Sequence, residues 1–160
     1  MNTVSVRPLE DVDRQWAGDQ IARQWGARMI VSKGKMYYPD KLPGFVAFQG
    51  DERVGLATYN IEAGDCELVS IQSLRDGHGA GSALLGAVKD AARSAGSKRL
   101  WLITTNDNLR ALGFYQKRGM SLVAVYLNAM EAARKLKPQI PMMGQNGIPL
   151  RDEIELEMIL

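Results

Sequence analysis

Three glycines at alternate positions, Gly77, Gly79 and Gly81, lie between an apolar segment typical of a strand and one typical of a helix. The first turn of a helix has backbone N–H groups without partners and a partial positive charge, and it therefore binds phosphate groups well. Glycine lets a ligand approach the main chain closely. The spacing indicates a pyrophosphate site in which the backbone N–H groups of residues 78–82 hold the ligand.

Two common phosphate-binding loops do not fit these glycines. A nucleoside-triphosphate loop requires Gly-x-x-x-x-Gly-Lys-Ser/Thr, and no Lys directly follows the glycines here. A dinucleotide loop requires Gly-x-Gly-x-x-Gly, but the last position is Ser82 when counted from Gly77 and Leu84 when counted from Gly79. The ligand of this loop is therefore expected to be a different pyrophosphate.

The loop resembles the acyl-CoA loop of the GNAT superfamily of N-acetyltransferases, which reads Gln/Arg-x-x-Gly-x-Gly/Ala. Here the frame is Asp76-Gly77-His78-Gly79-Ala80-Gly81. Asp76 stands where the family has Gln or Arg, and Arg75 lies one position earlier. This departure concerns the first side-chain contact with the cofactor and leaves the backbone site unchanged.

A second GNAT pattern follows at the expected distance, with one helix and one strand between the two. The segment from Asn108 to Met120 fits Asn-x-x-Ala-x-x-x-Tyr-x-x-x-Gly-Phe, with Tyr115 in place and Met120 instead of Phe. Both patterns in the correct order make the resemblance specific, and it covers most of the chain. It implies a GNAT fold and acetyl-CoA as co-substrate.

The resemblance also implies how the cofactor binds. In GNAT proteins the strand before the glycine loop diverges from the next parallel strand, and the pantetheine arm pairs with main-chain groups in the gap. A backbone N–H near Ser70 or Ile71 would polarise the thioester carbonyl, and Asn108 matches the residue that hydrogen-bonds the pantetheine. The cofactor contacts expected on this basis are Ile71, Ser73, Leu74, Asp76, Gly77, His78, Gly79, Ala80, Gly81, Ser82, Asn108 and Tyr115.

Tyr115 and Glu67 are the two expected catalytic residues. Tyr115 matches the family tyrosine near the cofactor sulfur, where a phenol donates a proton to the leaving thiolate; the alternative is a tyrosine that only packs against the cofactor arm. Glu67 lies early on the strand where several GNAT enzymes carry a Glu as general base. Strict alternation would put Glu67 on one face with Val69 and Ile71, among apolar neighbours that raise its pKa. The alternative for Glu67 is a solvated residue after a turn.

The composition argues against several other classes of protein. The chain has 160 residues, which suits a single domain over 1–160, with 46% hydrophobic and 24% charged residues. A net charge of +2 gives no argument for nucleic acid, and no apolar run reaches the length of a membrane span. The N-terminus lacks the features of a secretory signal, and one cysteine suits a reducing, cytoplasmic environment. A single His and a single Cys do not supply a zinc site, and neither His78 nor Cys66 is expected to be catalytic.

Hydrophobic periodicity predicts a mixed α/β fold. Tight turns make the strands between residues 44 and 74 antiparallel, whereas the strand–helix–strand unit over 65–103 makes its two strands parallel. The expected fold is GNAT-like, with a central, mostly antiparallel sheet, one parallel βαβ pair and helices on both faces. Strands are expected at 3–7, 44–48, 53–62, 65–74, 100–103, 120–127 and 154–160, and helices at 9–29, 84–95 and 108–117.

Two segments are expected near the acceptor. Residues 32–43 are polar and turn-rich, and in related enzymes this region lies beside the acceptor site; Tyr37 and Tyr38 either belong to that site or cap the core. Residues 137–152 form a long loop, and long loops in compact domains are often functional.

Charges near the end of the chain do not identify the acceptor, because they allow three interpretations. Asp152 and Glu153 would attract a cationic amine, whereas the basic residues at 134, 135, 137 and 151 would bind an acidic substrate. In the third interpretation the charges offset one another on a solvated edge. The last strand alternates apolar residues with glutamates and is expected to be half exposed. Its unpaired edge, at 153–160, would allow a homodimer.

The resemblance implies an N-acetyltransferase that transfers an acetyl group from acetyl-CoA to a primary amine of a small molecule, a peptide or a protein. Because no covalent nucleophile is evident, the amine would attack directly in a ternary complex, where proximity supplies much of the rate. Two alternatives stay open: a catalytically weak acyl-CoA-binding sensor or interaction module, and a transferase for another acyl-CoA. Retention of Asn108 and Tyr115 argues against the sensor.

Overall fold

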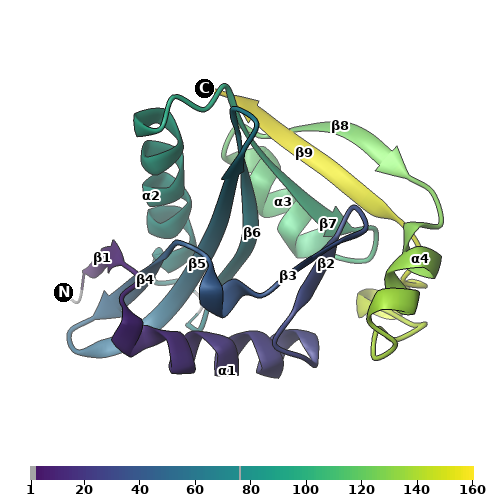
Figure 1. Ribbon diagram of the computed structural model, residues 1–160, viewed down its shortest axis with the longest axis horizontal. Helices are drawn as coiled ribbons and strands as arrows, with labels where there is room; N and C mark the ends of the chain where they lie inside the picture. The colour runs from purple at the N-terminus through teal and green to yellow at the C-terminus, as the bar shows by residue number, and fades with distance from the viewer. Residues whose placement is uncertain (1–2, 76) are drawn as a thin grey trace.

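The computed structural model describes residues 3–75 and 77–160, which form a seven-stranded sheet with helices on both faces (Figure 1). The strand order is β1-β4-β5-β6-β7-β9-β8. Helices α2 and α3 pack on one face of the sheet, and α1 packs on the other. The elements are β1 (Val4–Pro8), α1 (Arg14–Trp25), β2 (Ile30–Ser32), β3 (Lys35–Tyr37), β4 (Gly44–Gln49), β5 (Glu52–Glu62), β6 (Asp65–Ser73), α2 (Ala80–Ser94), β7 (Arg99–Thr105), α3 (Leu109–Lys117), β8 (Ser121–Tyr126), α4 (Ala129–Leu136) and β9 (Glu153–Ile159).

One strand pair of the sheet, β6 with β7, is parallel, and the other pairs within the described residues are antiparallel. The parallel pairing joins Cys66 to Leu100 and Glu67 to Trp101. β6 and β7 then diverge toward their carboxyl ends (Figure 1). The predicted mixed sheet, with one parallel pair and helices on both faces, is confirmed.

The apolar stripe of α2 lies at the centre of the main core. Leu84 and Val88 are fully buried and pack in the same cluster as Leu100 of β7. On the opposite face, Ile21 of α1 packs in a smaller cluster with Leu56 of β5. In the described part of the chain, no helix is long and apolar enough to span a membrane.

β9 is an interior strand, and the prediction of a half-exposed last strand is wrong. It pairs with β7 on one side and with β8 on the other. Glu153 and Glu155 are only 4% and 5% exposed, because the β2–β3 hairpin contacts both of them. Alternation along a strand identifies its two faces but not its neighbours. The edge on which a homodimer was predicted is therefore paired within the chain, and the edge strands are β1 and β8.

The β2–β3 hairpin lies within a segment that the sequence indicated only as turn-rich. Its three residue pairs join Ile30 to Tyr37, Val31 to Met36 and Ser32 to Lys35. The two turn residues, Lys33 and Gly34, have φ of 47° and 75°, as a tight hairpin turn requires. These strands are too short for periodicity to reveal them.

Asp13, at the start of α1, joins three parts of the chain. Its carboxylate accepts hydrogen bonds from Arg7 of β1 at 2.6 and 3.0 Å and from Arg53 of β5 at 2.9 and 3.1 Å. It also accepts one from the backbone N–H of Glu10 at 2.9 Å, and its side chain has no exposed surface. The hydrogen bonds from Arg7 hold the pKa of Asp13 well below its usual range, against the opposite effect of burial.

Candidate active site

The glycine loop after β6 leads directly into α2, as the sequence predicted. Gly77 and Gly79 have φ of 76° and 79°, in the left-handed region that favours glycine. Because α2 begins at Ala80, the N–H groups of its first turn lack partners within the helix. His78 is exposed, and its Nδ1 lies 3.1 Å from Nε2 of Gln49 in β4. The predicted cofactor residue Asp76 lies outside the described residues.

A basic groove on α3 continues from this loop. Arg118 donates a hydrogen bond to the Ser82 hydroxyl at 2.9 Å, and its guanidinium lies 3.7 Å above the centre of the Phe114 ring. The sequence did not predict this groove, although Lys117 lies on the same face of the predicted helix as Arg110 and Arg118 follows directly after it. The groove has a volume of about 410 Å³ and is lined by Leu109, Arg110, Gly113, Phe114, Lys117 and Arg118.

A β-bulge in β6 changes which residues share a face. Val69 is an extra residue between Leu68 and Ser70 in the pairing with β5. As a result, Leu68 and Ile71 both pack in the core beneath α2, whereas Glu67 faces the β2–β3 hairpin. The predicted strict alternation, with Glu67 and Ile71 on one face, is wrong at the bulge.

After the bulge, β6 has a paired strand on one side only. Ile71 and Ser73 pair with β5, and within the described residues β7 pairs with β6 no further than Glu67. The Leu74 N–H also bonds to β5, at the Val54 carbonyl oxygen. A strand with one open side is the arrangement in which an extended ligand can add as a pseudo-strand. The predicted divergence of the two strands is therefore present.

Glu67 lies where β6 and β7 begin to diverge, and it is 3% exposed. The Tyr37 hydroxyl donates a hydrogen bond to its Oε1 at 2.6 Å, and the Ser32 hydroxyl donates one to its Oε2 at 2.7 Å. Burial raises the pKa of Glu67, and the two hydrogen bonds partly offset that effect. The solvated alternative for Glu67 is excluded. Tyr37, for which the sequence left a role in the acceptor site or in the core open, contacts Glu67, and so does Ser32, which the sequence did not indicate.

Tyr115 and Asn108 lie on and before α3. Tyr115 is 7% exposed and packs edge-on against Phe114, with the ring centres 5.3 Å apart. Burial raises the pKa of Tyr115. The Asn108 side chain caps α3 by accepting a hydrogen bond from the Ala111 N–H at 3.3 Å, and it donates one to the Thr104 hydroxyl at 3.3 Å. Its predicted contact with the pantetheine stays a prediction.

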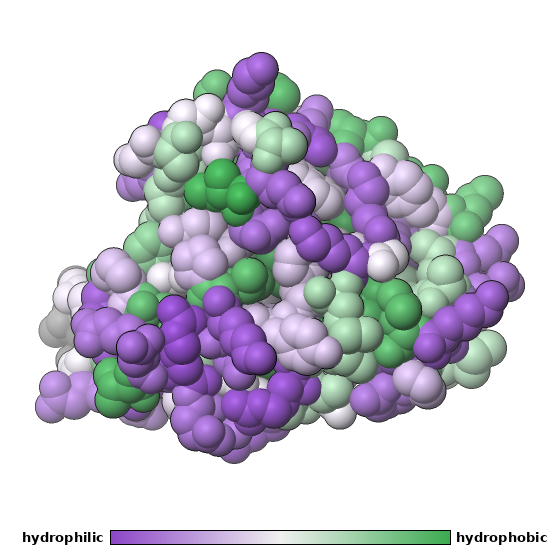
Figure 2. All heavy atoms as spheres, in the orientation of Figure 1, coloured by the Kyte–Doolittle hydropathy of each residue, from purple (hydrophilic) through white to green (hydrophobic). Residues whose placement is uncertain are grey.

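A pocket of about 170 Å³ lies beside Glu67, on the face that carries the β2–β3 hairpin. Its walls include the rings of Tyr37 and Trp101 and the carboxylates of Glu62 and Asp65. Figure 2 shows hydrophilic side chains gathered across the middle of this face. Within the described residues, no group of three or more His, Cys, Asp or Glu side chains could hold a metal ion.

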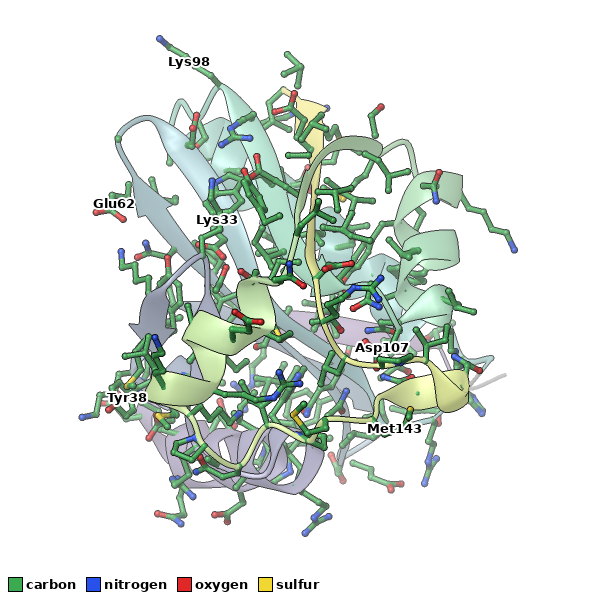
Figure 3. All side chains as sticks on the ribbon, turned by 90° about the vertical axis from the view of Figure 1, so that its right-hand side faces the viewer. Lys33, Tyr38, Glu62, Lys98, Asp107 and Met143 are labelled. Carbon is green, nitrogen blue, oxygen red and sulfur yellow. The ribbon has the colours of Figure 1, made fainter. Side chains whose placement is uncertain are left out.

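The long loop before β9 is fixed by the residues that follow β7. Asp107, 3% exposed, accepts a hydrogen bond from the Gln145 N–H at 2.7 Å, and its backbone carbonyl accepts one from Asn146 at 3.2 Å. Figure 3 shows Asp107 beside the part of this loop that carries Met143. The loop is thus an ordered border of the sheet.

The chain belongs to the acetyltransferase (GNAT) family, whose model matches residues 11–120. The uncharacterized protein YdhI of Bacillus subtilis (strain 168) is 42% identical over 157 residues, which are 97% of this chain and 98% of YdhI. YxbD of the same organism, also uncharacterized, is 40% identical over 154 residues, 96% of this chain and 97% of YxbD. A GNAT family acetyltransferase from Elizabethkingia anophelis, solved with acetyl-CoA bound, has the same fold, with a TM-score of 0.71, 20% identity and 100% of both chains covered.

Proposed function

We propose that this protein is a cytoplasmic N-acetyltransferase, a single domain over 1–160, that transfers an acetyl group from acetyl-CoA to a primary amine of a small molecule or a peptide. The observation that carries the proposal is the buried Glu67, held by two hydrogen bonds where β6 and β7 begin to diverge. A carboxyl group in this environment suits a general base. Membership of the GNAT family and the acetyl-CoA bound to the Elizabethkingia anophelis neighbour support the choice of acyl donor.

The residues around the glycine loop fit acetyl-CoA. The first turn of α2 offers backbone N–H groups to the pyrophosphate, and Lys117 and Arg118 add positive charge for the phosphates of the nucleotide. The open side of β6, near Ile71 and Ser73, offers main-chain partners to the pantetheine. Asn108 would contact the pantetheine by exchanging its hydrogen bond to Thr104.

The chemistry assigns one role to each catalytic residue. Glu67 takes a proton from the acceptor's ammonium, and the free amine attacks the thioester carbonyl carbon. The C–N bond forms, the C–S bond breaks, and Tyr115 donates its phenolic proton to the departing thiolate. Since burial raises the pKa of Tyr115, its hydroxyl stays protonated until the thiolate develops. A backbone N–H near the bulge, at Ser70 or Ile71, polarises the carbonyl.

Gly81→Val is expected to lower the affinity for CoA by about tenfold or more. A Cβ at Gly81 would lie 3.1 Å from two ring atoms of Phe114, so a branched side chain displaces the first turn of α2 from α3. That displacement misdirects the N–H groups that hold the pyrophosphate. Isothermal titration calorimetry with CoA, with the unfolding temperature of each protein, measures the effect.

Gly86→Ala is the matched control in the same helix. A Cβ at Gly86 meets nothing within 4 Å, so this variant should bind CoA like the wild type and gain about 1 kcal/mol of stability. If a folded Gly81→Val protein binds CoA with wild-type affinity, the first turn of α2 does not hold the cofactor.

Arg118→Met should weaken CoA binding by about tenfold, because it removes a charge-assisted contact with a phosphate. It should have a smaller effect on 3′-dephospho-CoA if Arg118 contacts the 3′-phosphate. Calorimetry with both ligands on both proteins gives a double-mutant cycle that isolates this pair. Equal losses for the two ligands would assign Arg118 to the pyrophosphate, and no loss for either would remove Arg118 from the site.

The proposed function is tested by thiol release from acetyl-CoA in the presence of a panel of primary amines. Acetylation of at least one amine, reduced in Tyr115→Phe while CoA still binds, supports the proposed transferase. Binding of CoA without transfer to any amine would contradict it and favour the acyl-CoA sensor. Transfer from longer acyl-CoA alone would identify a different acyl donor.

A further inference from the structure

Three buried glutamates lie beneath the tip of the β2–β3 hairpin. Glu67 of β6 and Glu153 and Glu155 of β9 are 3%, 4% and 5% exposed. Lys33, at the hairpin tip and labelled in Figure 3, hydrogen-bonds both Glu153 and Glu155. The preceding residue, Ser32, donates a hydrogen bond to Glu67. Two consecutive hairpin residues thus connect the carboxyl groups of three residues from two strands.

Neighbouring side chains balance the negative charge of Glu155 and satisfy its hydrogen bonds. Its carboxylate accepts hydrogen bonds from the Lys33 ammonium at 2.9 Å, the Arg99 guanidinium at 3.0 Å and the Tyr126 hydroxyl at 2.8 Å. Burial alone would raise the pKa of Glu155, but these partners bring it below its ordinary value. The Lys33 ammonium also lies 5.2 Å from the centre of the Trp101 ring. The ion pair between Glu155 and Lys33 therefore fixes the hairpin on the sheet.

Glu153 has the same burial and far fewer partners. Among the described residues, its hydrogen-bond donor is the backbone N–H of Lys33, at 3.3 Å. Burial raises the pKa of Glu153 and the nearby Glu67 raises it further, whereas the N–H and the charge of Lys33 both lower it. The Lys33 N–H bonds to Oε2 of Glu153, and no donor among the described residues bonds to Oε1. Buried carboxyl groups normally have more hydrogen-bond partners than this.

The position of Glu153 relates its carboxyl group to the acceptor site of the proposed function. Glu153 pairs with Thr105 of β7, at the end of the strand that diverges from β6. Glu67 and Glu153 therefore lie on either side of the diverging part of β7, and the hairpin tip touches both. This is where the proposed function, on which the inference rests, requires the acceptor amine to meet the thioester.

We propose that Glu153 is a second acidic group of the acceptor site, which binds the acceptor in its ammonium form beside Glu67. An ammonium ion is a cation with several N–H donors, and it supplies the hydrogen bonds that the Glu153 carboxyl group lacks. The acceptor class is therefore an aliphatic primary amine, which is protonated at neutral pH, rather than an aromatic amine or an alcohol.

Proton transfer balances in this arrangement. Of the three protons on the ammonium nitrogen, one passes to Glu67 before the attack and one stays on the amide product. The third leaves as the C–N bond forms and replaces the proton that Tyr115 gives to the CoA sulfur. Glu153 exchanges no proton in this step; in its ionised form it stabilises the cation until Glu67 accepts the proton.

Glu153→Gln tests this assignment, because Gln has the same shape and can still accept the Lys33 N–H. The Michaelis constant for an aliphatic amine is expected to rise about tenfold, the loss of one charge-assisted contact. The acid limb of kcat/KM should move to lower pH, since Glu67 no longer faces a second carboxylate. Among the described residues, the other titratable or charged groups around the pair are unchanged in this variant: Lys33, Lys35, Tyr37, Glu62, Asp65, Cys66, Arg99, Tyr126 and Glu155.

The control is Glu157→Gln on the same strand, since the Glu157 carboxylate is already paired with Arg99 at 2.9 Å. This variant should leave the Michaelis constant and the acid limb unchanged. The titration of the Glu67 carboxyl group, followed by NMR with ¹³C-labelled glutamate, provides a readout that needs no turnover. A fall in the pKa of Glu67 in Glu153→Gln supports the proposal.

An unchanged titration of Glu67 together with an unchanged Michaelis constant would overturn it. So would a loss of activity that only follows a lower unfolding temperature. If the wild type acetylates no amine, the proposed function fails, and the NMR titration alone then decides whether the two carboxyl groups interact.

Discussion

Glu67→Gln is expected to lower kcat/KM for amine acetylation by roughly a hundredfold to a thousandfold, the usual contribution of a positioned general base. Gln keeps the size of the side chain and an oxygen that can accept a hydrogen bond from Tyr37 or Ser32, but it cannot take a proton from the ammonium. CoA binding should change little, because Glu67 lies before the open part of β6. Steady-state kinetics and calorimetry on the same preparation separate the two effects.

The pH dependence gives a second readout of the same residue. Because burial raises the pKa of Glu67, the acid limb of kcat/KM should lie above the ordinary value of 4.5, with activity rising as the carboxyl group ionises. The Tyr37 hydrogen bond favours the ionised form, so Tyr37→Phe should move the limb to higher pH. Glu157→Gln, whose carboxylate lies outside the pocket beside Glu67 and is paired with Arg99, should leave both the acid limb and the rate unchanged. Wild-type activity in Glu67→Gln would show that another group, or water, takes the proton.

Asp13→Ala should destabilise the protein by about 3 kcal/mol or more, because it leaves two arginines without the buried carboxylate that joins them. For a chain of this length the unfolding temperature should fall by roughly 6–12 °C. Thermal and denaturant unfolding measure the change. The exposed neighbour Asp11 provides the control, and Asp11→Ala should cost less than about 0.5 kcal/mol.

The contribution of Asp13 also has a definite pH dependence. Its pKa in the folded protein lies well below the value of 3.8 that it has without these contacts. Its stabilisation is therefore complete above the unfolded value and is lost as the pH falls toward the folded value. The difference in stability between wild type and Asp13→Asn should shrink below about pH 4. A difference that stays constant into acid would mean that charge is not what Asp13 contributes.

Features encoded within a few neighbouring residues could be predicted from the sequence. The spacing of Gly77 and Gly79 before an apolar helical stripe predicted the loop and the start of α2. The uninterrupted apolar run from Leu100 to Ile103 predicted a central strand, and the strand–helix–strand order predicted its parallel partner. Each of these depends on local periodicity and on turn chemistry.

Contacts between distant segments could not be predicted in this way. Glu67 is bonded by Ser32 and Tyr37, which lie 35 and 30 positions away in the sequence. Glu153 and Lys33 are 120 positions apart. The bulge at Val69 puts the residues after it on the opposite face of the sheet from the one that strict alternation predicts, and nothing in the alternation of β6 indicates an extra residue. The same limit explains the wrong prediction for β9. Its alternating glutamates are typical of a solvent-exposed face, but the hairpin contacts Glu153 and Glu155.

The short pairing between β6 and β7 has a mechanical consequence. β6 and β7 pair over only two residue pairs. The sheet is therefore divided into two parts, β1-β4-β5-β6 and β7-β9-β8, which are joined only by this short pairing. An extended pantetheine arm lying in the gap would connect the two parts and make the sheet continuous. Under the proposed function, the surface beneath the acceptor would be complete only after the acyl donor has bound, and we expect an ordered kinetic mechanism in which the donor binds first.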